Sequence, residues 1–215
     1  MPKILLNATN IAHAFDYPLF SEINLTIKEQ ESIAILGRSG SGKSTLLHIF
    51  SSFIKPNSGD VELLDRDLYH LKEEDIENIR RNKLGIIFQA HYLFKGMKAI
   101  ENIEIATLLS NQNIDNSLLE RLEIKELMNQ KIGELSGGQQ QRISIARVLS
   151  KKPTLIFADE PTGNLDKETA SLVMDVLLEY TKEHNSGMIL VTHDESMANL
   201  CSKKYRLENQ KLEEF

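Results

Sequence analysis

Cysteine is nearly absent from this 215-residue chain, because Cys201 is the only one. A single cysteine excludes an internal disulfide, which fits a reducing compartment. The longest apolar runs, at residues 33–36 and 155–158, are far shorter than the roughly 20 residues of a membrane-spanning helix. The N-terminus has no charged segment followed by a long apolar core, so we expect no signal peptide.

Basic residues are outnumbered, with 25 Lys and Arg against 31 Asp and Glu, which gives a net charge of −6. A basic surface for nucleic acid is therefore not expected, and nucleic acid is not a predicted partner. Internal repeats and low-complexity segments are also lacking. The length fits one domain over residues 1–215.

Short apolar runs rich in β-branched residues predict buried strands at residues 32–36, 84–88, 154–158 and 188–192. Residues 167–184 repeat apolar side chains on one helical face, and Asp166 is placed to cap the start of that helix. Strands that alternate with helices predict an α/β fold with a mainly parallel sheet.

Three segments depart from this alternation. Residues up to about 27, together with 61–64, predict short strands of an N-terminal antiparallel β subdomain. Residues 204–212 predict a closing hairpin around Asn209. Residues from about 90 to 150 predict a helical subdomain inserted between two strands. Its apolar stripe contains Ile100, Ile103, Ile105 and Leu108.

A glycine-rich segment, GRSGSGKST, joins the first predicted strand to a helix. Its glycines allow backbone N–H groups to converge on phosphate oxygens, where a Cβ would obstruct the curve. Lys43 offers a positive charge to the β- and γ-phosphates, and Ser44 offers a hydroxyl to Mg²⁺. We expect nucleotide binding by all nine residues: Gly37, Arg38, Ser39, Gly40, Ser41, Gly42, Lys43, Ser44 and Thr45.

Two carboxylates, Asp159 and Glu160, follow the predicted strand at 154–158. Adjacent carboxylates beside a metal can divide charge neutralisation and general-base catalysis, and Glu160 is placed to polarise an attacking water. Pro161 predicts an extended exit that fixes both side chains. His193 follows the strand at 188–192 and is a third catalytic candidate, placed to sense the γ-phosphate. Solvated acids and a surface histidine are the alternatives.

The segment LSGGQ, at residues 135–139, precedes a predicted helix. The start of that helix presents free N–H groups and the positive end of the helix dipole, which makes a second candidate anion site. One nucleotide does not need both anion sites within one chain. Taken alone, the sequence SGG would more simply cap a helix.

The order of these motifs resembles the ATP-binding cassette family, and the resemblance covers nearly the whole chain. The matching order is residues 37–45, Gln89 after a strand, 135–139, 155–160, 164–166 and His193. The resemblance implies a P-loop ATPase core that couples ATP hydrolysis to transport. It also implies a head-to-tail dimer, in which each LSGGQ segment binds the γ-phosphate held by the second copy.

The resemblance further implies roles for single residues, with ATP and Mg²⁺ as the ligands. Ser44, Gln89 and Asp159 would hold Mg²⁺, and Phe15 would stack on adenine, with Tyr17 as an alternative. The implied catalytic set is Lys43, Gln89, Glu160 and His193. Further contacts to ATP would come from Ser136, Gly137, Gly138, Gln139 and Asp166.

The string ADEPTGNLD at residues 158–166 resembles a branch with lipoprotein-releasing (LolD-type), macrolide-export (MacB-type) and cell-division (FtsE-type) ATPases. The segment AHYLFKGMKAIENI, after Gln89, resembles the lipoprotein-releasing type best. Gln30 and the pair Asn209 and Gln210 depart from the family, which has glycine in these turns. Translation cassettes are double and repair cassettes carry a long coiled coil, and this chain has room for neither.

The implied partners are a second copy of the chain and integral membrane transporter subunits, at the cytoplasmic face of the inner membrane. The loop after Gln89 is the expected contact with the membrane subunit. Tyr92 and Phe94 are its expected aromatic anchors for a short cytoplasmic helix of that subunit. Alternatively, these bulky side chains fill the core of the helical subdomain.

Overall fold

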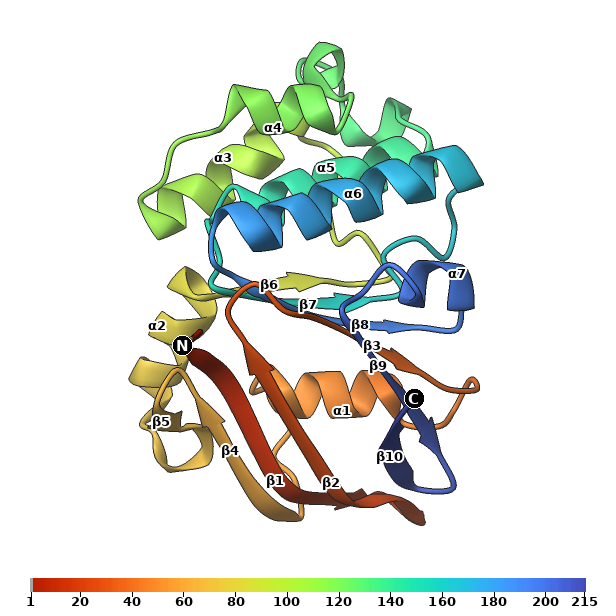
Figure 1. Ribbon diagram of the computed structural model, residues 1–215. Coiled ribbons are helices and arrows are strands. Elements are labelled where there is room, and N and C mark those ends of the chain that lie inside the picture. The colour runs from red at the N-terminus through yellow and green to blue at the C-terminus, as the bar shows by residue number, and fades with distance from the viewer. Residues whose placement is uncertain (1) are drawn as a thin grey trace.

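The parallel sheet predicted from the sequence is confirmed in the computed structural model, which describes residues 2–215 (Figure 1). Its strand order is β10-β9-β3-β8-β7-β6, and β10 alone runs antiparallel to its neighbour. The six strands are β3 (Ser32–Leu36), β6 (Leu84–Ile87), β7 (Leu155–Asp159), β8 (Gly187–Thr192), β9 (Lys203–Glu208) and β10 (Lys211–Glu214).

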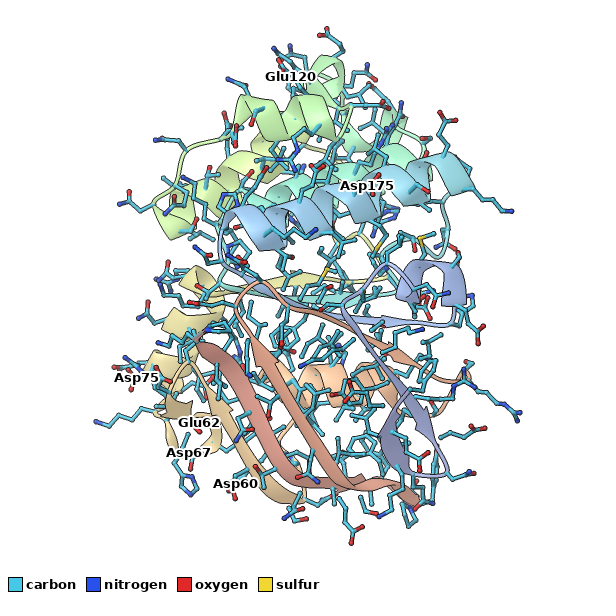
Figure 2. All side chains as sticks on the ribbon, viewed as in Figure 1. Asp60, Glu62, Asp67, Asp75, Glu120 and Asp175 are labelled. Atoms are coloured by element: carbon cyan, nitrogen blue, oxygen red, sulfur yellow. The ribbon has the colours of Figure 1, made fainter. Side chains whose placement is uncertain are left out.

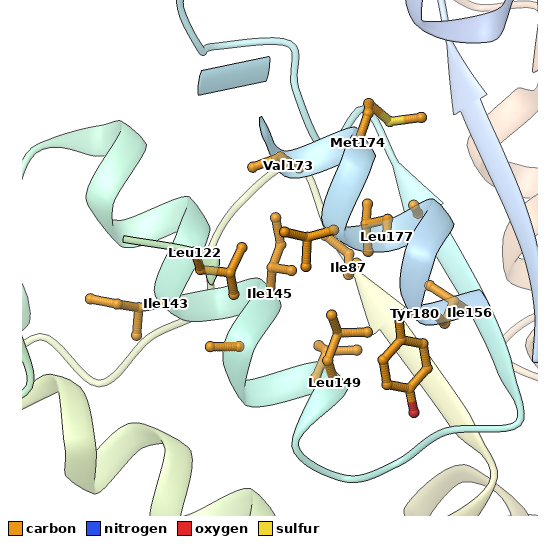
Figure 3. Close-up of a cluster of buried hydrophobic side chains, with 14 of the residues drawn as sticks. Ile87, Leu122, Ile143, Ile145, Leu149, Ile156, Val173, Met174, Leu177 and Tyr180 are labelled. Carbon is orange, nitrogen blue, oxygen red and sulfur yellow. The ribbon is translucent and has the colours of Figure 1, made fainter. Parts of the chain in front are cut away.

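Helices cover both faces of this sheet. In Figure 1, α5 (Gly137–Leu149) and α6 (Lys167–Glu183) lie on one face, and α1 (Lys43–Phe50) lies on the other. Successive side chains of a strand therefore point to opposite faces of the sheet. In β3, Ala34 and Leu36 join the core under α5 and α6. Ile33 and Ile35 join the core around α1. Figure 3 shows the first core, in which side chains of α5, α6, β6 and β7 meet.

A second, antiparallel sheet closes over α1, with strand order β2-β1-β4-β5. Its strands are β1 (Ile4–Ala14), β2 (Pro18–Lys28), β4 (Ser58–Leu63) and β5 (Arg66–Asp67). The N-terminal sheet is thus as predicted, but β1 and β2 are 11 residues each instead of several short strands. Asn10 (φ 52°) and Glu22 (φ 54°) interrupt the pairing where the register shifts, and such irregularities hide a long strand from period-two patterning.

The connection from β4 to β6 carries a short 3₁₀ turn, η1 (Leu68–His70), and α2 (Glu73–Asn82). Figure 2 shows four carboxylates of this region, Asp60, Glu62, Asp67 and Asp75, along the outer side of β4, β5 and α2. These side chains contribute to the acidic charge balance that the composition shows.

The chain between β6 and β7 is helical, as predicted. It comprises α3 (Ala99–Ser110), α4 (Asn116–Arg121), η2 (Lys125–Leu127), η3 (Ile132–Glu134) and α5. The predicted apolar stripe of α3 is correct at Ile103, which is fully buried, and wrong at Leu108, which is 82% exposed. Thr107 and Ser110 are buried instead, because their hydroxyls donate to carbonyls one turn back, at 3.0 and 2.8 Å.

The last elements follow the sequence closely. Asp166 caps α6 as predicted, accepting a hydrogen bond from the Thr169 N–H at 3.0 Å. The short helix α7 (Glu195–Ala198) follows β8, and the β9–β10 hairpin turns at Asn209 (φ 50°) and Gln210 (φ 64°). In residues 2–215, no helix combines the length and apolarity needed to cross a membrane.

Candidate active site

Four neighbouring parallel strands end at one edge of the large sheet, and the predicted site residues follow them there. The order β3-β8-β7-β6 brings together the loops that begin after Leu36, Thr192, Asp159 and Ile87. Carboxyl ends of parallel strands are where open α/β sheets bind ligands. The loops line a cleft of about 650 Å³. Its lining residues are Phe15, Tyr17, Leu19, Ser39, Gly40, Gly42, Lys43, Ser44, Thr45, Gln89, Asp159, Glu160 and His193.

The glycine-rich loop enters α1 through a left-handed glycine, Gly42 (φ 96°). A Cβ at this position would lie 2.7 Å from Leu19, so glycine is required by both the backbone and the packing. The Lys43 side chain returns across the loop, and its ammonium donates to the carbonyls of Gly37 (2.7 Å) and Arg38 (3.0 Å). The positive charge is therefore fixed beside the first turn of a helix, where an anion is favoured.

Three residues of the glycine-rich loop do not line this cleft. Gly37, Arg38 and Ser41 face a neighbouring cleft of about 480 Å³, between the loop and the β9–β10 hairpin. A Cβ on Gly37 would lie 2.8 Å from the Leu207 carbonyl oxygen, so this glycine permits the close approach of β9.

Asp159 and Ser44 meet at the floor of the cleft, where the Ser44 hydroxyl donates to the Asp159 carboxylate at 3.1 Å. Burial raises the pKa of the Asp159 carboxyl, and the hydrogen bond from Ser44 opposes the rise. Gln89 lines the same cleft. A hydroxyl, a carboxylate and an amide are oxygen donors of the kind that Mg²⁺ takes, together with phosphate oxygens and water.

Glu160 is held by two residues from the end of β8. His193 Nδ1 lies 2.9 Å from Glu160 Oε1, and the Thr192 hydroxyl donates to Oε2 at 3.3 Å. The extended exit predicted from Pro161 is wrong, because Glu160 has a left-handed φ of 47°. The Glu160 N–H donates to the Val191 carbonyl at 3.0 Å, and this bond to β8 holds the residue in a conformation that is rare before proline.

Two aromatic rings stand at the mouth of the cleft. Phe15 is 60% exposed and Tyr17 is 63% exposed, so both present a free face to a nucleobase. The His13 ring packs against Phe15 edge to face, with centroids 4.8 Å apart. Within residues 2–215 the Tyr17 ring has no such aromatic neighbour, so the Phe15 ring is the better fixed of the two.

Residues 136–139 and Asp166 do not line the cleft of their own chain. The Ser136 hydroxyl accepts from the Gln139 N–H at 3.3 Å, and Gln139 Oε1 accepts from the Ser136 N–H at 2.9 Å, so the pair caps α5. Apart from its chain neighbours and the backbone of its own helix, no heavy atom of residues 2–215 lies within 4 Å of a Cβ placed on Gly137. The start of α5 is thus an open surface with free N–H groups, and Asp166 is exposed at the start of α6.

Taken together, the cleft offers a flat ring for a base, backbone and lysine charge for phosphates, and oxygen donors for a cation. It also offers a carboxylate within hydrogen-bond reach of a histidine, which is an arrangement suited to activating water. These are the requirements of nucleoside triphosphate hydrolysis.

Two residues were not predicted from the sequence: Thr192, which donates a hydrogen bond to Glu160, and Leu19, which lines the cleft. A threonine before His193 carries no signal by itself, because its effect depends on strands β7 and β8 being neighbours. The polar contacts of α5 with the loops after β6 and β7 were also missed, because they depend on tertiary packing alone.

The ABC transporter family model matches residues 20–163 of the chain. The uncharacterized ABC transporter ATP-binding protein YbbA of Escherichia coli (strain K12) is 38% identical over 202 residues, which cover 91% of this chain and 89% of that protein. The lipoprotein-releasing system ATP-binding protein LolD of Rickettsia bellii is 42% identical over 199 residues, which cover 89% and 87%.

Among solved structures, the dimeric post-hydrolysis state of the ATP-binding cassette MJ0796, bound to ADP and Pi, superposes with a TM-score of 0.89. It is 31% identical, and the match covers 97% of both chains. Sequence, fold and cleft agree, and the chain belongs to the ABC transporter family as an ATP-hydrolysing, ATP-binding cassette subunit.

Proposed function

We propose that this cassette dimerises on ATP and drives a separate inner-membrane subunit that releases lipoproteins from that membrane. The observation that carries the proposal is that Tyr92 and Phe94, in the loop after Gln89, are 67% and 55% exposed. The likeness to LolD proteins, at 37 to 42% identity, supports lipoproteins as the cargo.

The proposed dimer is head to tail, with the start of α5 of each copy over the cleft of the other. Two features of the single chain support it. The capped α5 terminus has free N–H groups and open space at Gly137, and this terminus lies outside its own chain's cleft. A further support is that the related cassette MJ0796 has been solved as a dimer with ADP and Pi.

In this proposal Phe15 stacks on adenine, while Lys43 and the loop N–H groups hold the β- and γ-phosphates. Ser44, Asp159 and Gln89 would hold Mg²⁺, which when bound neutralises phosphate charge. Glu160 accepts a proton from the attacking water, and His193 orients the Glu160 carboxylate through the 2.9 Å hydrogen bond.

The docking surface consists of Tyr92, Phe94 and Phe53, together with the half-buried Phe88. Tyr92 and Phe53 both pack edge to face on Phe88, with centroids 5.2 and 6.3 Å apart. Arg80 lies over the Phe53 ring at 5.0 Å. An aromatic surface of this kind suits a short amphipathic helix from the cytoplasmic side of a membrane protein.

A second candidate is a cassette that serves another membrane partner, in cell division or in macrolide export. The observation in its favour is that the uncharacterized ATP-binding protein YbbA is about as similar to this chain as the LolD proteins are. The cytoplasmic helix of the partner, and not the nucleotide cleft, would distinguish these functions.

The test is to tag the chain, recover it from detergent-solubilised membranes, and identify the membrane protein that co-purifies. The complex is then reconstituted in liposomes that contain a labelled lipoprotein, with a soluble lipoprotein acceptor outside. We expect ATP-dependent transfer of the label to the acceptor, and no transfer with Glu160→Gln. Recovery of a cell-division protein, or a complex that hydrolyses ATP without transferring label, would overturn the lipoprotein assignment.

A further inference from the structure

Helix α5 begins at the proposed anion site and ends against the proposed docking loop. The loop contacts come from Ser144 and Arg147, which share a helical face because they are three residues apart. The Ser144 hydroxyl donates to the His91 carbonyl at 3.1 Å. The Arg147 guanidinium donates to the carbonyls of Tyr92 (2.7 Å) and His91 (3.1 Å).

One turn earlier on the same face, Gln141 contacts the loop that carries the proposed catalytic base. Its amide donates to the Pro161 carbonyl at 2.9 Å, next to Glu160. Gln141 is 3% exposed, and its Oε1 has no hydrogen-bond partner among residues 2–215. A single face of α5 therefore contacts the main chain of both loops that follow β6 and β7.

The position of Arg147 carries a desolvation cost. The side chain is half-buried, and this desolvation lowers the pKa of the guanidinium. Among residues 2–215, no carboxylate forms an ion pair with it. A half-buried charge without a counter-ion loses part of its hydration, and hydrogen bonds to the protein must compensate for that loss. Here the compensation is the fork of two bonds to the loop carbonyls, a geometry that lysine cannot supply.

The loop that Arg147 holds is strained. Tyr92 has a φ of 46°, in the left-handed region that a bulky residue seldom adopts. Such a conformation is unfavourable and persists only where neighbouring contacts fix it. The bonds from Ser144 and Arg147 fix the carbonyls of His91 and Tyr92, so a shift of α5 along or about its axis would release or reset the loop.

We propose that Arg147 is a positioning residue that transmits capture of the second copy's ATP to the loop at residues 91–94. A helix is stiff, and Gly137 and Arg147, which are ten positions apart, are separated by about 15 Å along its axis. When the start of α5 closes on the γ-phosphate, the far end moves with it and carries the two loop carbonyls. The inference rests on the head-to-tail dimer of the proposed function. It couples closure of that dimer to the position of the docking loop.

The test uses the purified protein without any membrane partner. The chain contains no tryptophan, so Phe94→Trp introduces a single indole into the loop. The reporter chain carries Phe94→Trp and Lys43→Ala, so it binds no ATP but keeps its own LSGGQ segment. The second chain carries Glu160→Gln, so it binds ATP without hydrolysing it. A dimer of two Glu160→Gln chains contains no tryptophan and gives no indole emission. Two reporter chains bind no ATP, so ATP cannot join them.

We expect the indole emission to shift as ATP and the second chain are added, and to saturate as the mixed dimer forms. Arg147→Gln in the reporter should abolish the shift while dimerisation, followed by sedimentation, stays unchanged. Arg147→Lys should also abolish it, because one ammonium cannot replace the fork. Ser144→Ala should reduce the shift, and this small change carries the test if the Arg147 variants do not fold.

Three results would overturn the proposal. One is a full emission shift in folded Arg147→Gln or Ser144→Ala dimers. Another is a mixed dimer that forms on ATP without any shift in the unmodified reporter. Absence of an ATP-dependent mixed dimer would instead show that the proposed head-to-tail dimer is wrong, and the transmission role would fall with it.

Discussion

The Glu160 carboxylate and the His193 imidazole form a hydrogen bond of 2.9 Å between the ends of two neighbouring strands, β7 and β8. The bond joins two residues 33 positions apart, and it leaves His193 exposed at the cleft, with Glu160 mostly buried beside it. A water placed between this pair and the phosphate loop would face a carboxylate whose orientation is already fixed.

The first prediction is that Glu160→Gln slows ATP hydrolysis by roughly 10²–10⁴-fold, the usual effect of losing a general base. An amide is nearly isosteric, so nucleotide binding should remain and an ATP-bound dimer should accumulate. Single-turnover hydrolysis and size-exclusion chromatography with ATP measure both effects. Turnover close to that of the unmodified protein would show that Glu160 is not the base.

A second prediction concerns Thr192, which donates to Glu160 Oε2 and accepts from the Asp194 N–H at 3.0 Å. Thr192→Val removes the donor and should lower kcat about tenfold or more, the effect of one hydrogen bond to a charged group. The KM for ATP should stay unchanged, because Thr192 does not line the cleft. Thr192→Ser keeps the hydroxyl and should restore kcat. Equal losses in both variants would assign Thr192 a packing role only.

Local sequence patterns predicted the elements that carry the site. The apolar runs located β3, β6, β7 and β8 to within one residue at every end, because buried parallel strands are apolar on both faces. Asp166 and the turn at Asn209 were also predictable, since capping and turning are local effects. Gln30, which replaces the usual glycine, keeps the left-handed turn at φ 62°.

The parts that sequence could not supply depend on contacts between distant segments. The left-handed φ of Glu160 opposes the local rule for a residue before proline, and it is stabilised by a bond to Val191 on another strand. The contact of Arg147 with residues 91 and 92 likewise joins positions about 55 residues apart. Neither pairing can be read from spacing along the chain.

A third prediction separates the two anion sites. Lys43→Ala should lose ATP binding in its own chain, because the fixed positive charge of the loop is removed. Gly137→Asp should keep ATP binding and block dimer closure, since a carboxylate would then face the γ-phosphate. The structure has open space at Gly137, so the new side chain should not disturb folding. Nucleotide binding by the monomer and ATP-dependent dimerisation measure the two effects.

Mixing the two inactive variants should restore one complete site, formed by the phosphate loop of the Gly137→Asp chain and the intact LSGGQ segment of the Lys43→Ala chain. Gly137→Ala is the control that adds bulk without charge. If Gly137→Asp abolishes ATP binding by the isolated monomer, the segment acts within its own chain and the head-to-tail arrangement is wrong.

A fourth prediction follows from Lys151, whose ammonium donates to the carbonyls of Arg80 (3.1 Å) and Leu84 (2.9 Å). Burial and the nearby Arg147 charge lower the pKa of Lys151 to about 8, below its ordinary value of 10.5. Between these values the unfolded chain binds more protons than the folded one, so this group's contribution to stability rises with pH. Below about pH 8 the penalty for the buried charge is fully present.

The measurement is the free energy of unfolding at pH 7 and pH 10 for the unmodified protein and for Lys151→Met. The unmodified protein should gain stability relative to the variant as the pH rises through this window. Lys152→Met, which replaces the exposed neighbouring lysine, is the control and should show no such change. A pH-independent difference for Lys151→Met would show that its ammonium is not desolvated in solution.

The last prediction concerns the docking loop. Tyr92 and Phe94 are 67% and 55% exposed, so neither is held mainly by core packing, whereas Leu93 between them packs against the core. Tyr92→Ala and Phe94→Ala should therefore fold and keep the basal ATPase rate, while stimulation of that rate by the membrane subunit falls. Aromatic anchors at the centre of an interface typically cost more than about 2 kcal/mol when truncated, which is more than tenfold in affinity.

Leu108→Ala is the matched control, because Leu108 is an exposed apolar residue of α3 outside the loop. It should leave both the basal and the stimulated rates unchanged, which would show that losing exposed apolar area alone does not uncouple the complex. Thermal unfolding of each variant separates docking from folding. If Tyr92→Ala and Phe94→Ala lower the melting temperature and the basal rate together, the rings support the cassette itself, and the membrane subunit must bind at another surface.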